Sequence, residues 1–143
     1  MRGAGLVSAG LLGIWELPQN VLGLTTLLVE AGLGTVEGLE HDRGRLFVHS
    51  RKCAVNLGLF IFWREGENRW FVLDKWTRAH EYGHSFQSRW LGPLYLPLVG
   101  VPSVLRVLYA VAYRELMKER WQRYFDGYPE NWADRLGGVE RGG

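Results

Sequence analysis

Three side chains within the stretch AHEYGH have the types and the spacing of a metal-dependent hydrolytic site. His80 and His84 stand four residues apart, and Glu81 directly follows the first histidine. In a helix, residues four apart project side by side, so both imidazoles can reach one ion at roughly 2.0–2.1 Å. Glu81 then lies beside the metal, where it can take a proton from an activated water. The spacing predicts a zinc site with Glu81 as general base; the alternative is two histidines that only share a helix face.

A catalytic zinc needs a third protein ligand in addition to the two histidines. Cys53 is the only cysteine and lies in strand-like sequence, so the third ligand is expected to be a histidine or a carboxylate. Glu130 and Asp134 are again four residues apart, on an expected helix. One of them can bind the metal while the other accepts the ring N–H of a ligating histidine. The sequence leaves these third-ligand candidates open: His41, His49, Glu115, Glu119, Glu130 and Asp134.

The helix that must carry the histidines is expected to begin near Asp74 or Thr77 and to end at Leu91, before Gly92-Pro93. Gly83 lies inside this helix, although glycine costs about 1 kcal/mol relative to alanine there. A glycine between two candidate ligands predicts that another backbone packs closely against that face. Plain helix packing would explain it equally well.

A β section is expected before this helix. Residues 45–50, 54–63 and 69–73 are rich in β-branched and aromatic residues, and the polar run REGENR separates the last two. This pattern predicts a small, three-stranded antiparallel sheet. Residues 54–63 are the candidate strand for pairing with an extended substrate, with Gly58 allowing a close backbone approach. The alternative for these residues is an ordinary central core strand.

Two further helices are expected after the histidine helix. Residues 92–103 contain three prolines and cannot form one regular element, and their uncharged run is too short by itself to span a bilayer. A long helix is expected over residues 103–125. A short helix should follow, with Pro129 at its first position and Gly137-Gly138 at its end.

The N-terminal segment, residues 1–38, carries one charge, Glu16, between Arg2 and Glu30. A helical region is expected over residues 3–32, broken near Pro18. A membrane span would place Glu16 near its middle at a cost of about 3 kcal/mol, and no small-residue cleavage site marks a signal peptide. We therefore expect a buried or interfacial helix. Residues 3–29 could still enter a bilayer, so both a membrane-associated and a cytoplasmic location stay open.

Length and charge limit the remaining classes. The 143 residues fit a single domain, residues 1–143, with residues 44–138 as its core. The formal net charge is +2, and the basic residues are scattered. This distribution argues against a nucleic-acid partner.

The motifs HEYGH and ENWAD together resemble those of the gluzincin metallopeptidases. The resemblance implies His80, His84 and Glu130 as zinc ligands, Glu81 as the base, and Asp134 as the support of a ligating histidine. The ending of the second motif is similar to membrane-linked gluzincins of the CaaX prenyl protease type. The longer strings HEYGHSFQSRWLGPLYLPLVGVPS and WADRLGG are similar to a group of small bacterial proteins with the same signature.

The resemblance implies an α+β, zincin-like fold: a small antiparallel sheet, then the histidine helix, a long helix and a short C-terminal helix with the third ligand. It also implies a Zn²⁺-dependent hydrolase that acts on peptide or protein substrates, with contact to a membrane surface left open. The alternatives are a metal-binding protein without turnover and a membrane-associated structural protein. For the group that stabilises the oxyanion, the sequence leaves four candidates: Tyr82, Tyr124, Tyr128 and His49.

Overall fold

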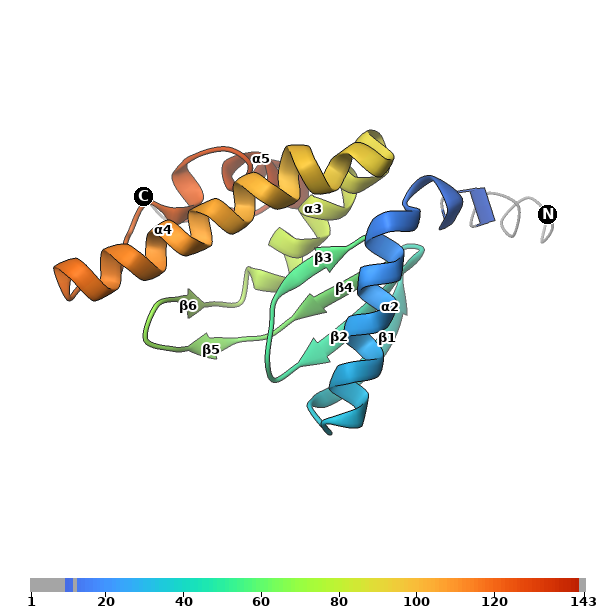
Figure 1. Cartoon of the computed structure of the whole chain (residues 1–143), viewed down its shortest axis with the longest axis horizontal. Coiled ribbons are helices and arrows are strands. Elements are labelled where there is room, and N and C mark those ends of the chain that lie inside the picture. The colour runs from blue at the N-terminus through green and yellow to red at the C-terminus, as the bar shows by residue number, and fades with distance from the viewer. Residues whose placement is uncertain (1–9, 12, 142–143) are drawn as a thin grey trace.

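The fold is α+β, with a four-stranded sheet between helices (Figure 1). A computed structural model describes residues 10, 11 and 13–141, so part of the expected N-terminal helix, residues 3–9 and 12, lies outside the described residues. Helix α2 spans Leu17–Gly32. Pro18 lies in its first turn, so the expected break near this proline falls at the start of α2. The sheet contains β1 (Val36–Asp42), β2 (Arg45–Ser50), β3 (Val55–Leu57) and β4 (Phe60–Trp63).

The sheet differs from the expected three-stranded antiparallel arrangement. Its strand order is β1-β2-β4-β3, and β2 pairs with β4 in parallel. Residues 54–63 do not form one strand. They turn back at Gly58, whose φ of 67° is in the left-handed region, so that β3 and β4 pair in antiparallel. A Cβ at Gly58 would lie 2.1 Å from Oδ1 of Asn20, so this glycine accommodates α2 rather than a substrate. The polar run after β4 belongs to a separate hairpin of β5 (Gly66–Glu67) and β6 (Val72–Leu73).

The sheet is packed between α2 and the histidine helix. Phe60 of β4 contacts α2 at Gly23, while Phe47 of β2 packs its ring against Tyr82 on the opposite side. Tyr82 belongs to α3, which spans Thr77–Leu91 and ends where Gly92-Pro93 was expected to end it. Asp74 closes the preceding turn by accepting hydrogen bonds from the backbone N–H of Trp76 and from the hydroxyl of Thr77. The buried aliphatic and aromatic residues of β2 and β4 form the centre of this core.

The proline-rich segment is helical but irregular. It consists of the 3₁₀ turn η1 (Gly92–Leu94) and the π-helical turn η2 (Leu96–Gly100), which continues into α4 (Val101–Met117). Among the described residues, Leu96–Met117 is the one helix that is long and apolar enough, by length and composition alone, to cross a membrane. The uncharged run before α4 is by itself too short to cross a membrane. Because η2 continues into α4, the combined helix has 22 residues. The long helix ends earlier than expected, because Lys118 adopts a left-handed conformation with φ of 63°.

The chain then returns towards α3. After the turn η3 (Tyr124–Asp126), the short helix α5 spans Glu130–Gly137, directly after Pro129. Gly138, with φ of 69°, ends it. Figure 1 shows α5 behind α4 and beside α3, so the two helices with the sequence motifs lie together.

Candidate metal centre

The inward face of α3 is polar, which is unusual for a helix that packs against a sheet. Its buried positions include His80, Glu81 and His84 together with serine, threonine and glutamine side chains. Buried polar groups need hydrogen-bond partners, because leaving one unpaired costs about 1–3 kcal/mol. The partners of the histidines come mainly from α5.

Two glycines bring α3 and α5 into backbone contact. A Cβ on Gly83 would lie 1.9 Å from the carbonyl oxygen of Ala133, and a Cβ on Gly137 would lie 2.1 Å from the carbonyl oxygen of Ala79. No larger residue fits at either position without moving a helix. The close backbone approach predicted from Gly83 is therefore confirmed, with α5 as the partner. This crossing places the first turn of α5 over the histidines.

His80, His84 and Glu130 converge on one point. Oε2 of Glu130 lies 2.9 Å from Nε2 of His80 and 3.1 Å from Nε2 of His84. The ligand atoms of all three residues lie within 4.8 Å of one another, and all three side chains are buried. The structure thus brings together the two histidines and one of the six third-ligand candidates, and this group can hold a metal ion.

Both histidine rings are oriented by acceptors on their other nitrogen. Nδ1 of His80 lies 2.6 Å from Oδ1 of Asp134, and Nδ1 of His84 lies 2.6 Å from Oε1 of Gln87. The Gln87 amide is itself oriented, because its nitrogen donates to the carbonyl of Pro129. Each Nδ1 must therefore carry a proton, which leaves the Nε2 of a neutral ring with a lone pair. Two lone pairs and a carboxylate oxygen then face one another, and a proton or a metal ion between them relieves their repulsion.

The charges of the site are strongly coupled. Burial alone would lower the pKa of His80, but hydrogen bonds to Asp134 and Glu130 outweigh it and raise the pKa to about 9. Burial alone would raise the pKa of Glu130, but hydrogen bonds from the two histidines hold it well below its usual range. The pKa of Asp134 is lowered in the same way, against the effect of burial, by His80 and by Arg141. Both carboxylates are therefore anionic and favour a bound cation.

Glu81 lies beside the three converging residues without joining them. It is buried, and burial raises the pKa of its carboxyl, although the nearby histidines act in the opposite direction. A carboxylate with a raised pKa accepts a proton more readily than an ordinary one. This side chain lies close enough to His80, His84 and Glu130 for their charges to act on its pKa.

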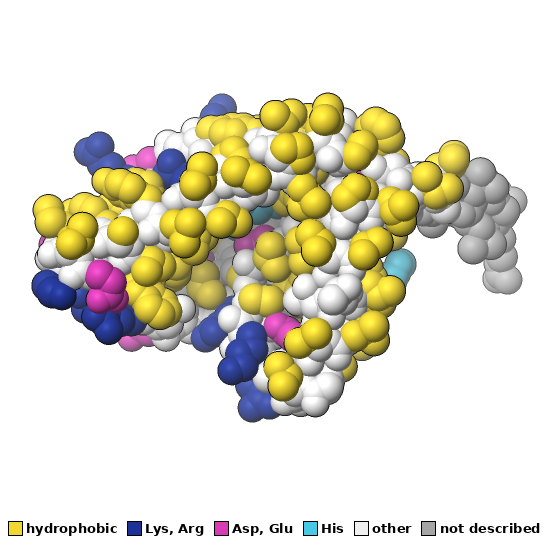
Figure 2. Space-filling model, in the orientation of Figure 1, with side chains coloured by type: hydrophobic (Ala, Val, Ile, Leu, Met, Phe, Trp, Pro, Cys, Tyr) yellow, Lys and Arg dark blue, Asp and Glu magenta, His cyan; other side chains and the backbone are white. Residues whose placement is uncertain are grey.

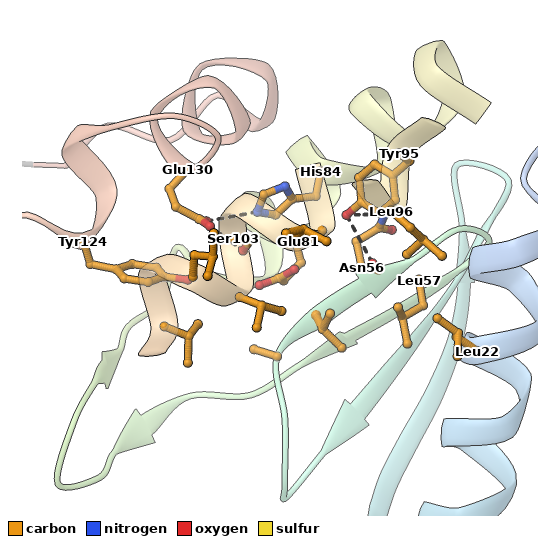
Figure 3. Close-up of a pocket in the computed structure, with 17 residues that line it drawn as sticks. Leu22, Asn56, Leu57, Glu81, His84, Tyr95, Leu96, Ser103, Tyr124 and Glu130 are labelled. Atoms are coloured by element: carbon orange, nitrogen blue, oxygen red, sulfur yellow. Dashed lines mark hydrogen bonds and ion pairs between the residues drawn. The ribbon is translucent and has the colours of Figure 1, made fainter. Parts of the chain in front are cut away.

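Two clefts meet at Glu81. The larger, about 460 Å³, is bounded by α2, β3 and α4 and reaches His84 and Glu130 (Figure 3). The smaller, about 270 Å³, reaches His80 from the side of the β5–β6 hairpin. Glu81 and Tyr124 line both clefts. The site can therefore be reached from the surface along the edge strand β3.

Of the other third-ligand candidates, Asp134 lies at the site as the partner of His80, and the remaining four lie elsewhere. His49 stacks on Trp63, and His41 is exposed in β1. Glu115 pairs with Arg69, and Glu119 accepts a hydrogen bond from Tyr113. Cys53 donates to Glu30, and burial raises the pKa of its thiol to about 12. These residues have other partners or lie away from the three converging side chains.

Of the candidates for oxyanion stabilisation, Tyr124 is the one at the site. Its hydroxyl points towards Ser103 and Glu81 (Figure 3), and burial raises its pKa, so that it stays a neutral donor. Tyr82 packs on the sheet, and Tyr128 donates to the carbonyl of Leu98.

Sequence reasoning missed two residues that hold the site together. Gln87 lies three residues after His84, and this helical spacing could have identified it. The hydroxyl of Ser103 donates to Oε1 of Glu130, the oxygen that faces away from the histidines. Ser103 lies on α4, and no sequence signal relates it to the motifs.

Comparisons with models of protein families, with curated proteins and with solved structures gave no match to this chain.

Proposed function

We propose that the protein is a zinc-dependent hydrolase, a metallopeptidase of the gluzincin type on a zincin-like fold. The observation that carries this proposal is the convergence of two histidine Nε2 atoms on one oxygen of Glu130, with both Nδ1 atoms held by acceptors. Two imidazole nitrogens and one carboxylate oxygen are the ligands of a common class of catalytic zinc site. Asp134 and Gln87 accept hydrogen bonds from the Nδ1 atoms, and histidines that bind zinc need such partners.

The chemistry follows from the groups around the site. A bound zinc ion would lower the pKa of a water molecule and polarise a carbonyl group. Glu81 takes the proton of the attacking water as the new carbon–oxygen bond forms, and then gives it to the amide nitrogen as the carbon–nitrogen bond breaks. The neutral hydroxyl of Tyr124 donates a hydrogen bond to the carbonyl oxygen as it gains negative charge. No serine or cysteine nucleophile is needed.

The edge strand β3 suits an extended substrate. It is the last strand of the sheet, and Val55, Asn56 and Leu57 all line the larger cleft. Its outer edge has no strand partner among the described residues. A peptide that pairs with this edge would pass Glu81, which favours a peptide or protein substrate.

Metal analysis tests the first half of the proposal. We expect one zinc per chain in purified protein, and loss of this zinc in a double His80→Ala, His84→Ala variant. Glu130→Gln should weaken binding strongly, whereas the matched change Glu119→Gln on an exposed residue should not. If Glu119 mattered and Glu130 did not, the assignment of the third ligand would be wrong.

Turnover tests the second half. Wild type, Glu81→Gln and Tyr124→Phe, each loaded with zinc to the same stoichiometry, are compared on a mixed peptide library. We expect Glu81→Gln to abolish cleavage and Tyr124→Phe to lower kcat by about 10²–10³-fold, as the loss of one oxyanion donor does. Indistinguishable digests from wild type and Glu81→Gln would reject the hydrolase and leave a metal-binding protein without turnover.

A further inference from the structure

Helix α2 turns its charged and amide side chains inwards and most of its apolar residues outwards. Its buried positions are Gln19, Gly23 and Glu30, whereas its leucines and valines are largely exposed. Glu16, just before the helix, is also buried, in an ion pair with Arg45. A surface helix of a water-soluble domain shows the opposite pattern. The exposed apolar residues of α2 are Leu17, Val21, Leu22, Leu24, Leu28 and Val29.

The helix formed by η2 and α4 has the same character. Only 11% of its most apolar stretch is buried, and its mean hydropathy there is 1.6. Arg106 is the one charged residue between Leu96 and Tyr113, and its guanidinium turns inwards to the carbonyl of Tyr124. The outward side of this helix is therefore apolar over most of its length. Its exposed residues include Leu98, Val101, Val104, Leu105, Leu108 and Tyr109.

The two helices lie on the same face of the molecule, which we call the apolar face. Figure 1 shows α2 and α4 nearest the viewer, and Figure 2 shows hydrophobic side chains spread over both. Between them the surface is hollowed, and acidic and histidine side chains are visible inside. Leu22, Val104 and Leu105 are exposed on this face and also line the larger cleft. The entrance to the candidate metal centre is thus part of the apolar face.

We propose that the apolar face docks on a lipid bilayer, so that the larger cleft opens at the membrane surface. Continuous apolar patches larger than a few hundred Å² are rare on monomeric soluble proteins and mark contact with a partner or a membrane. A protein that covered this face would close the cleft, whereas a fluid bilayer leaves room for a segment to enter. Inward polar and outward apolar side chains are the arrangement that lipid contact requires.

The contacts of α4 favour docking over crossing. Ser103 bonds to Glu130 and Arg106 to Tyr124, while Glu115 pairs with Arg69 at the far end of the helix. The helix is therefore attached to the domain along its length and lies along its surface, as an interfacial helix does. The docking does not depend on catalysis. If the protein is also the proposed hydrolase, the docking implies its substrate class. These substrates would be apolar polypeptide segments at the membrane surface.

Vesicle binding of the full-length, zinc-loaded protein tests the docking. Flotation with phosphatidylcholine vesicles and with mixed phosphatidylcholine–phosphatidylglycerol vesicles measures the partition coefficient. We expect Leu28→Glu and Leu108→Glu each to lower it about tenfold or more, because each removes a leucine from the apolar phase and adds a charge. The matched control is Val72→Glu on β6, since Val72 is exposed by 51% while Leu28 and Leu108 are exposed by 64% and 58%. The control should bind as wild type does.

A second measurement does not rely on charged variants. In a Cys53→Ser background, a polarity-sensitive fluorophore is attached at Leu108→Cys or at Val72→Cys. Vesicles should shift the emission to the blue at position 108 only. A wild type that stays free of both kinds of vesicle overturns the proposal, and so does equal binding by all three glutamate variants. A stable dimer that Leu108→Glu dissociates, without vesicle binding, would instead identify a second copy of the chain as the occupant.

Discussion

Replacing Gly83 by alanine is expected to weaken metal binding strongly while leaving the fold largely intact. The added Cβ would lie 1.9 Å from the carbonyl oxygen of Ala133 and 2.7 Å from its carbonyl carbon. Real Cβ contacts are not shorter than 3.0 Å, and a helix backbone cannot rotate aside as a side chain can. Helix α5 must therefore move away from α3 by at least about 1 Å.

The loss of stability and the loss of zinc affinity differ in size. Overpacking costs about 1–3 kcal/mol of stability, and alanine returns about 1 kcal/mol through its better helix propensity. The net loss of unfolding free energy should be about 0–2 kcal/mol. Metal ligands tolerate errors of only about 0.2 Å. Because α5 carries both Glu130 and Asp134, a displacement of about 1 Å should lower zinc affinity at least 10–100-fold.

Zinc affinity is measured by competition with a chromogenic chelator, and stability by thermal unfolding in excess chelator. Gly137→Ala should behave like Gly83→Ala, because its Cβ would lie 2.1 Å from the carbonyl oxygen of Ala79. Gly32→Ala, at the end of α2 with nothing within 4 Å, is the control and should leave affinity unchanged. If Gly83→Ala bound zinc as tightly as wild type, the close crossing would not be what positions the third ligand.

Three further outcomes are expected. Asp134→Asn should lower zinc affinity about 10–100-fold, because His80 loses its anionic partner, and competition with a chelator measures this. In metal-free protein, the raised pKa of His80 contributes stability that is present below its unfolded value of about 6.5 and is lost as pH rises towards about 9. The melting temperature in chelator should therefore fall over this range, and less so in His80→Ala. Arg45→Met should destabilise the protein by about 3–5 kcal/mol, because it leaves the buried Glu16 unpaired. Urea unfolding measures this loss, and Asp42→Asn, which weakens solvent-accessible ion pairs with Arg43 and Arg78, should cost less than about 1 kcal/mol.

The helices that carry the site could be predicted because their signals are local. The spacing of His80 and His84 needs only helical geometry, and Gly92 with Pro93 ends α3 whatever the remaining chain does. Gly83 also predicted one tertiary contact, since a glycine inside a helix indicates that another backbone packs closely against it. It could not say which helix that neighbour was. The six candidates for the third ligand were therefore separated only by the tertiary crossing of α3 and α5.

The sheet could not be predicted because strand pairing is not a local property. Residues 54–63 contain no polar turn signal apart from Asn56 and Gly58, and Asn56 points towards Tyr95 inside the fold. The turn at Gly58 is fixed by Asn20 of α2, whose Oδ1 accepts a hydrogen bond from the backbone N–H of Leu59. Nothing near residue 58 in the sequence indicates that contact. The parallel pairing of β2 with β4 follows from this turn, since it reverses the direction of the chain between β3 and β4.

The N-terminal segment shows a different limit of sequence reasoning. A carboxylate such as Glu16 argues against an apolar environment only if it faces that environment. Here it accepts hydrogen bonds from Arg45 and Ser88, inside the contact between α2, β2 and α3. Its charge is therefore compensated by the protein, and it places no penalty on the outward side of the helix. Hydropathy along a sequence averages over all directions around a helix, so a helix buried in a core and a helix on a bilayer look alike. The direction in which the charged and amide side chains point distinguishes them, and in α2 Gln19 points to α3 and Glu30 points to the sheet.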